Sequence, residues 1–248
     1  MLSKSQINLL KSLQQKKFRR EHGLFIVEGH KSIIEFINSA YPVEAVYYTP
    51  SFDSKVLKLS QKINFCEISV TELEKVSSLK TPQDALALIK IPQWPILQHE
   101  QLKGKFSLVL DGVQDPGNMG TIVRIADWFG IDNIICSEDT VDAYNPKVVQ
   151  ACMGSLARVK VHYISLTDFL PKIKLPVFGA LLDGVNIYQT DFGKEGLIVM
   201  GNEGNGLRPE VQKMVNEAIT IPRIGKAESL NVAIATALFC SEITRKSC

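Results

Sequence analysis

The most constraining feature of this 248-residue chain is the regular alternation of short apolar runs and amphipathic stretches in its C-terminal part. Between residues 106 and 244 the apolar runs are predicted strands, and the stretches between them carry apolar residues at helical spacing. Strands that alternate with helices in this way pair in parallel, because each helix returns the chain to the same edge of the sheet. The sequence therefore predicts an α/β fold with a mainly parallel sheet and helices on both faces.

The individual elements of this part follow from the same patterns. The predicted strands are 106–110, 131–136, 158–163, 177–181, 196–200 and 218–221. The predicted helices are 120–129, one that starts at Asn145-Pro146, 167–173, 209–216 and 231–244. Asn118 is expected to cap the first of these helices, and Ser229 or Asn231 the last one.

The first ninety or so residues form a smaller α/β pattern. Its predicted strands are 24–27, 43–48, 65–68 and 85–89, and its longer helices are 7–13, 30–38 and 54–62. A further short helix is expected to begin at Thr71, with Glu74 completing a capping box. Pro92 and Pro95 then interrupt both helix and sheet. We therefore expect two domains, 1–95 and 104–248, joined near residues 91–104.

Composition narrows the class of protein. No apolar run approaches the roughly 18 residues of a membrane span, and the N-terminus lacks the apolar stretch of a secretory signal. The five cysteines are scattered and odd in number, so neither a disulfide framework nor a zinc site is expected. We expect a cytoplasmic protein without a metal and without a membrane anchor.

Charge is nearly balanced overall but uneven along the chain. The formal net charge is +2, whereas proteins that bind nucleic acid by bulk electrostatics are usually more basic. Near the N-terminus the basic residues cluster at Lys11, Lys16, Lys17, Arg19 and Arg20. Such a cluster either contacts phosphates or is a solvated helix face, and the sequence leaves both interpretations open.

Three blocks place polar residues at predicted strand ends or helix starts, where α/β proteins bind ligands. The first, 115–124, contains Asn118 and Arg124. The second, 201–207, is rich in glycine and contains Glu203. The third comprises Ile221-Pro222 and residues 229–233. Taken alone, the first block also fits a capped helix with a surface arginine. The Gly-x-x-Gly-x-Gly spacing of the second block differs from the dinucleotide-binding pattern, and no Lys-Ser/Thr pair follows it as in a phosphate loop.

Together and in this order, the three blocks resemble those of the SpoU (TrmH-type) branch of the SPOUT RNA methyltransferases. Residues 17–20 and 25–29 are similar to the small substrate-binding domain that many members of this family carry. The resemblance implies methylation of a ribose 2′-hydroxyl of RNA with S-adenosylmethionine as methyl donor. It also implies a C-terminal trefoil knot and a homodimer whose subunits complete each other's active sites.

The resemblance assigns roles to particular residues. The implied catalytic set is Asn118, Arg124, Glu203, Ser229 and Asn231. The implied cofactor contacts lie around Gly201, Ile221 and Leu230, and no metal is needed. Because arginine normally stays protonated, Arg124 is either a proton acceptor, as the family proposal has it, or a clamp for the RNA phosphate. Arg223 departs from the family pattern, which more often has an apolar residue after the Ile-Pro pair.

The extra N-terminal domain favours ribosomal RNA over tRNA as substrate, by analogy only. A tRNA 2′-O-methyltransferase and a non-catalytic RNA-binding protein of the same fold are the alternatives. A nucleotide-dependent oxidoreductase is a third, but no glycine-rich turn follows any early strand.

Overall fold

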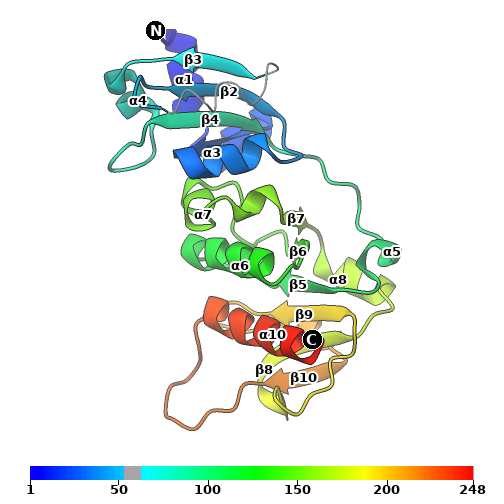
Figure 1. The fold of residues 1–248 in the computed structure, drawn as a ribbon. Coiled ribbons are helices and arrows are strands. Elements are labelled where there is room, and N and C mark those ends of the chain that lie inside the picture. The colour runs from blue at the N-terminus through cyan, green and yellow to red at the C-terminus, as the bar shows by residue number, and fades with distance from the viewer. Residues whose placement is uncertain (53–62, 248) are drawn as a thin grey trace. The chain divides into compact units, whose positions relative to one another are not determined.

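The computed structural model describes residues 1–52 and 63–247, which form two compact units. The N-terminal unit comprises Met1–Gln93 and the later segment Asp142–Ala157. The C-terminal unit comprises Trp94–Val141 and the chain from Arg158 onward. Figure 1 shows the elements of both units. The predicted helix 54–62 lies outside the described residues, whereas the strands on either side of it are described.

The C-terminal unit is built on a sheet of six strands that are all parallel, in the order β10-β8-β9-β5-β6-β7. The strands are β5 (Phe106–Leu110), β6 (Asn133–Cys136), β7 (Lys160–Tyr163), β8 (Val177–Asn186), β9 (Gly196–Met200) and β10 (Glu217–Thr220). This arrangement confirms the predicted parallel sheet. β5 and β9 lie next to each other at its centre, with Leu108 opposite Ile198.

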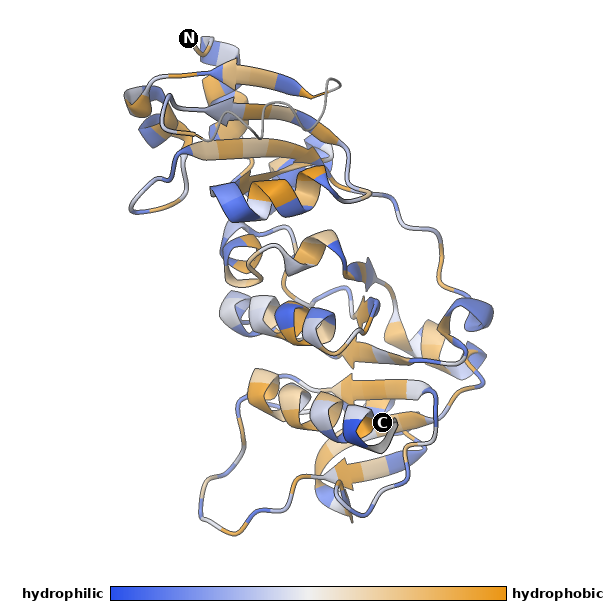
Figure 2. Ribbon diagram, viewed as in Figure 1, coloured by the Kyte–Doolittle hydropathy of each residue, from blue (hydrophilic) through white to orange (hydrophobic). Residues whose placement is uncertain are grey.

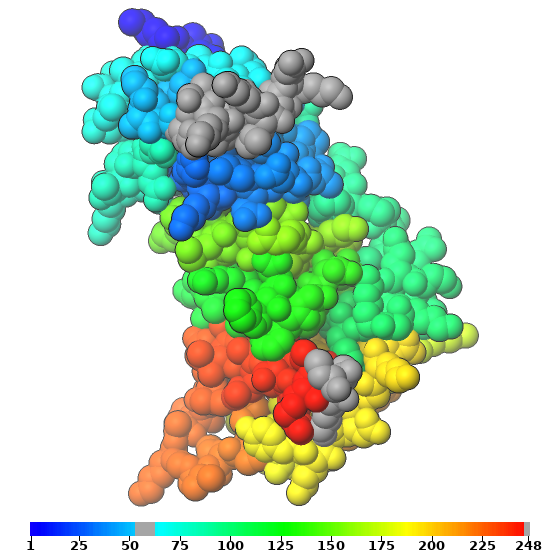
Figure 3. Space-filling view, viewed as in Figure 1, coloured from blue at the N-terminus to red at the C-terminus, as the bar shows by residue number. Residues whose placement is uncertain are grey.

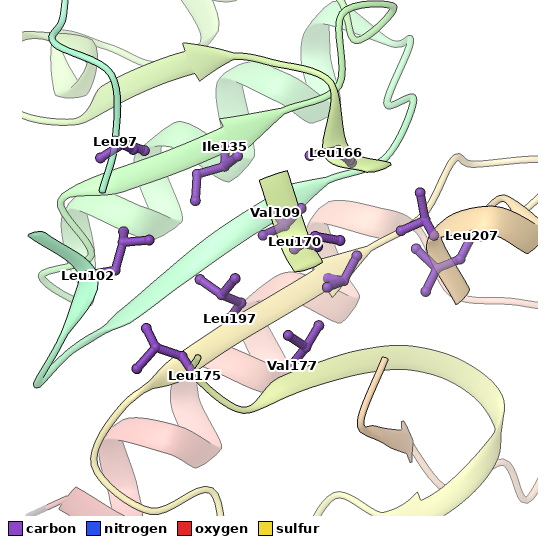
Figure 4. Packing of buried hydrophobic residues seen from close by; sticks show 12 residues of the cluster. Leu97, Leu102, Val109, Ile135, Leu166, Leu170, Leu175, Val177, Leu197 and Leu207 are labelled. Atoms are coloured by element: carbon purple, nitrogen blue, oxygen red, sulfur yellow. The ribbon is translucent and has the colours of Figure 1, made fainter. Parts of the chain in front are cut away.

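Both faces of this sheet are covered by helices. The helices are α5 (His99–Leu102), α6 (Pro116–Trp128), α8 (Leu166–Phe169), η3 (Leu170–Lys172), α9 (Pro209–Gln212) and α10 (Val232–Ser247). On one face, alternate strand residues such as Val109 and Leu197 pack against Leu102, Leu166 and Leu170 (Figure 4). α6 and α10 contact each other and reach the sheet through β6 and β9. The central strands β5 and β9 are strongly apolar (Figure 2), as expected of strands buried on both sides of the sheet.

Three details of the C-terminal unit differ from the sequence prediction. Asp115, not Asn118, caps α6: its Oδ1 accepts from the Asn118 backbone N–H at 2.7 Å. The predicted helix 167–173 is an α-helical turn followed by a 3₁₀ turn, because Pro171 has no N–H with which to continue an α-helix. α9 ends at Gln212, four residues earlier than predicted.

The N-terminal unit contains a four-stranded mixed sheet in the order β1-β4-β2-β3. The strands are β1 (Leu24–Glu28), β2 (Val43–Tyr48), β3 (Asn64–Glu67) and β4 (Ala85–Lys90), and the helices are α1 (Lys4–Ser12), α2 (Lys16–His22), α3 (His30–Ile37), α4 (Val70–Val76) and α7 (Pro146–Ala151). Leu10 and Leu73 pack on one face of the sheet against Ile26 and Leu86. On β1, Phe25 contacts Phe36 of α3 and, from the later segment, Tyr144.

The predicted cap of α4 was wrong by two residues. Ser69 caps this helix, and Glu72 accepts from the Ser69 backbone N–H to complete the capping box. The predicted cap at Asn145 is confirmed, since its side chain accepts from the Lys147 N–H. The basic cluster near the N-terminus divides: Arg19 is buried, while Lys16, Lys17 and Arg20 on the same helix are exposed.

Candidate active site

Topology explains why the first two blocks meet. β5 and β9 are neighbouring parallel strands, so the segments that follow them leave the sheet at the same edge. The first block follows β5 and the second follows β9. The third block follows β10 and leads into α10. The sheet therefore brings polar residues that are far apart in sequence close together at one edge.

Glu203 ties the second block to the first. Its carboxylate accepts hydrogen bonds from the backbone N–H groups of Gln114 (3.2 Å) and Asp115 (3.1 Å). It also accepts from Asn118 Nδ2 at 3.0 Å. Glu203 thus holds the turn that precedes α6, and its oxygens are occupied by donors from this turn.

Asn118 extends the connection to the third block. While its Nδ2 donates to Glu203, its Oδ1 accepts from Asn231 Nδ2 at 2.8 Å. Asn231 Oδ1 in turn accepts from the backbone N–H groups of Ala233 (2.9 Å) and Ile234 (3.3 Å). Asn231 therefore caps α10, one of the two predicted alternatives. The network Glu203-Asn118-Asn231 joins all three blocks.

The hydrogen bonds to Glu203 set its ionisation. Burial of the carboxyl raises its pKa, but the hydrogen bonds donated by the Asn118 side chain and by nearby backbone N–H groups lower it more. The net result is a pKa below the usual glutamate value. Glu203 is therefore held as a carboxylate, which suits an anchor better than a proton donor.

The second block is a tight turn closed by its own backbone. Asn202 and Gly206 exchange two backbone hydrogen bonds of 2.9 and 3.0 Å. Gly201 lies so close to this turn that a Cβ on it would come within 2.4 Å of the Gly206 carbonyl carbon. Asn202 Nδ2 donates to the Gly112 carbonyl at 2.6 Å and so fixes the turn beside the end of β5. A side chain at position 201 would push this turn out of place.

A cavity of about 660 Å³ lies beside this network within the C-terminal unit. The three predicted cofactor residues, Gly201, Ile221 and Leu230, all line it. Its other walls come from residues 180–183 of β8, the glycine-rich turn, the loop after β10 and the first turns of α10. The volume is in the usual range for a small-molecule or cofactor site.

The remaining predicted site residues divide between the cavity and the surface. Glu203 and Ser229 line the cavity. Arg124 lies outside the lining that the described residues form and is exposed on α6. It follows Asn118 by six residues, which places the two side chains about 120° apart around the helix. The cavity of this chain is thus built without Arg124.

Sequence reasoning missed one ion pair behind the glycine-rich turn. Asp111, which is 1% exposed, follows β5 and pairs with the Arg208 guanidinium at 2.5 Å. It also accepts from the Arg208 backbone N–H at 2.8 Å. This pair joins the end of β5 to the start of α9. An acidic residue directly after a largely apolar strand was the signal in the sequence.

Comparison with known proteins identifies the family. The SpoU rRNA Methylase family model matches residues 105–241, which is more than half of the chain. The chain belongs to the SpoU rRNA methylase family. It is therefore an RNA methyltransferase, as the three blocks predicted. The MRM3-like substrate binding domain model matches residues 4–87.

Individual relatives cover almost the whole chain. The 23S rRNA (guanosine(2553)-2′-O)-methyltransferase RlmP of Bacillus subtilis is 28% identical over 92% of this chain and 91% of its own. Among solved structures, a protein of Porphyromonas gingivalis assigned to the TrmH family of RNA methyltransferases superposes with a TM-score of 0.90 at 38% identity, covering 99% of both chains. An AdoMet-bound rRNA methyltransferase from Sinorhizobium meliloti superposes with a TM-score of 0.90 at 27% identity, covering 100% of this chain and 98% of its own.

Residues 1–52 and 63–247 contain neither a candidate metal site nor a candidate membrane span. No group of three His, Cys, Asp or Glu side chains there is arranged to hold a metal ion. In the same part of the chain, no helix has the length and apolar character needed to cross a membrane.

Proposed function

We propose that this SpoU family member transfers a methyl group from S-adenosylmethionine to a ribose 2′-hydroxyl of ribosomal RNA. The observation that carries the proposal is the network Glu203-Asn118-Asn231, which joins the three family blocks beside a cavity of cofactor size. The relatives named above support it, because RlmP acts on 23S rRNA by its name and the Sinorhizobium structure contains AdoMet.

The cavity suits S-adenosylmethionine in shape and chemistry. Apolar side chains of Ile221, Leu230 and Phe239 can contact an adenine ring. The close-packed glycine turn offers backbone groups without intervening side chains. Carboxylates also line the cavity, and they complement a cationic sulfonium. When bound, the cofactor supplies an electrophilic methyl group.

The residues of the chain have to align the ribose hydroxyl and disperse its proton. Asn118 is held between Glu203 and Asn231, so its position at the edge of the site is fixed by hydrogen bonds on both sides. We assign Arg124 to the RNA side, where its planar guanidinium binds a phosphate or the ribose. Ser229, in the cavity wall, contributes a hydroxyl to the same region.

Substitution of Arg124 tests this assignment. Arg124→Ala is expected to abolish methylation while cofactor affinity, measured by calorimetry, stays unchanged, because Arg124 lies outside the cavity lining. Arg124→Lys keeps the charge but loses the planar fork. Wild-type methylation by the Lys variant would rule out a guanidinium-specific role. Loss of cofactor binding in both variants would show that Arg124 belongs to the cofactor side.

Ribosomal RNA is the proposed substrate rather than tRNA. RlmP, which the chain matches over nearly its whole length, is named for 23S rRNA. The exposed Lys16, Lys17 and Arg20 on α2 of the N-terminal unit are the proposed phosphate contacts. Mapping of 2′-O-methyl groups in total RNA from a deletion strain tests this. Loss of a single site in tRNA, with rRNA unchanged, would contradict the proposal.

We also propose a homodimer, formed through the C-terminal unit and acting in the cytoplasm. On α10, Val232 and Phe239 are buried within the unit, so this side of the helix serves the core. Ile234, on the same helix, is 54% exposed, and Trp128 at the end of the neighbouring α6 is 84% exposed. Such apolar side chains on two packed helices suit a subunit interface.

Light scattering tests the dimer, since the monomer mass is 27.6 kDa. Ile234→Asp is expected to shift the mass toward that of a monomer. Val70→Asp is the control, because Val70 is similarly exposed on α4 of the other unit. A monomeric wild type would rule out the dimer. The trefoil knot implied by the family resemblance stays a prediction.

A further inference from the structure

The loop between β10 and α10 brings a positive charge to the cavity. Arg223 lies in this loop and lines the cavity, whereas Lys226 in the same loop does not. Figure 3 shows the loop, in orange, at the surface of the C-terminal unit. Among the described residues that line the cavity, the other charged side chains are the carboxylates of Asp183, Glu203 and Glu228.

The Arg223 side chain is exposed but is held by a hydrogen bond. Its Nη1 donates to the Ala227 carbonyl at 3.3 Å, which ties the guanidinium across its own loop. A guanidinium carries five N–H donors, so this bond leaves most of them for a ligand. Glu203 is engaged by donors of the first block, and no ion pair joins it to Arg223 within the described residues.

The charges of the lining mirror those of the cofactor. S-adenosylmethionine carries two positive groups, the sulfonium and the ammonium, and one negative group, the carboxylate. The three carboxylates of the lining complement the positive groups. They repel the cofactor's carboxylate, which therefore needs a cation of its own. Arg223 is the cationic residue in the described lining, and arginine binds carboxylates in a bidentate manner.

We propose that Arg223 binds the carboxylate of the methionyl part of S-adenosylmethionine and thereby selects ligands that carry an intact amino-acid moiety. This inference rests on the cofactor assigned in the proposed function. Because the loop is exposed to solvent, which weakens ion pairs, we expect a moderate effect of about tenfold in affinity.

Calorimetry on the full-length protein tests the proposal with two ligands, S-adenosylmethionine and its decarboxylated analogue. The wild type is expected to bind S-adenosylmethionine the more tightly. Arg223→Gln is expected to weaken binding of S-adenosylmethionine about tenfold while binding the analogue at least as tightly as before. Arg223→Lys, which keeps the charge, is expected to retain part of the preference.

Lys226→Gln is the matched control, because it removes a cation from the same loop outside the lining. It is expected to leave both affinities unchanged. Equal weakening of both ligands by Arg223→Gln would show that Arg223 only orders the loop and would overturn the proposal. Unchanged binding of both ligands, with a raised KM for RNA, would place Arg223 on the RNA and also overturn it. A wild type that binds neither ligand would instead overturn the proposed function itself.

Discussion

At the scale of single residues, Asp115 and Asn118 divide two roles at the start of α6. Asn118 was expected to cap α6, but Asp115 takes that role. The Asn118 side chain is thereby free to bridge Glu203 and Asn231. Asp and Asn are equally good caps, so residue type alone does not separate a structural from a functional role. The decisive contacts join residues more than 80 positions apart, which no local pattern encodes.

Glu203 links the stability of the site to pH. Its pKa is lowered in the folded protein, so its contribution to stability is present above the usual glutamate pKa of about 4.3 and is lost as the pH falls through the lowered value. Glu203→Gln is expected to lower stability at pH 7 by about 1 kcal/mol, because a neutral amide accepts these hydrogen bonds less strongly. Thermal unfolding between pH 3 and 7 measures the effect.

The Gln variant is expected to lose part of the wild-type dependence of Tm on acid pH. Glu210→Gln is the control: Glu210 is exposed, and its distance to Arg208 is 4.0 Å. If the Glu203 variant and wild type show the same dependence on pH, the carboxylate does not anchor the turn.

At the scale of elements, strands were predicted more accurately than short helices. β2, β5 and β9 have the predicted bounds, because each is an apolar run with clear ends. The missed or misplaced elements are helices of one or two turns, such as α2, α8 and α9. Tertiary packing and caps stabilise such helices more than propensity does, and neither is visible in a local pattern. β8 extends five residues beyond its apolar run because β10 pairs with its later part.

The start of α4 offers a test of capping. The predicted cap was Thr71 with Glu74, whereas in the structure Ser69 caps the helix and Glu72 completes the capping box. Ser69→Ala is expected to destabilise the N-terminal unit by about 1 kcal/mol. Thr71→Ala, the matched control on the exposed surface, is expected to change stability by less than about 0.5 kcal/mol. Urea unfolding of both variants measures the difference, and the reverse order of effects would support the Thr71 cap.

At the scale of the whole molecule, the two units do not correspond to two consecutive stretches of the chain. Residues 142–157 lie between β6 and β7 in sequence but pack within the N-terminal unit. The buried guanidinium of Arg19 donates to Asp142 at 2.6 Å and also to the carbonyl groups of Leu13 and Gln14. Arg19 and Asp142 are 123 positions apart. Arg19 therefore has a structural role within the basic cluster. The sequence around it did not distinguish it from the exposed basic residues of α2.

This buried pair is expected to be costly to break. Asp142→Ala leaves the Arg19 charge buried without its carboxylate, and such changes typically cost about 3–5 kcal/mol. Arg19→Met combined with Asp142→Ala is expected to cost less than the sum of the two single changes. Urea unfolding of the four proteins gives the coupling energy. A coupling near zero would mean that the carbonyl groups, and not Asp142, hold Arg19 in place.

The position of Arg124 bears on how two copies of the chain work together. Because Arg124 lies outside the cavity lining of its own chain, we expect it to serve the site of the other subunit in the proposed dimer. Arg124→Ala and Asn231→Ala are each expected to be inactive as homodimers. When the two variants are co-expressed, a mixed dimer combines one intact cavity with one intact Arg124. Statistical mixing is then expected to restore about a quarter of wild-type activity in the whole population, and about half in purified mixed dimers. If Arg124 serves its own cavity, the mixed dimers contain no complete site and stay inactive. Methylation assays on dimers purified with two different tags therefore distinguish a shared site from an independent one.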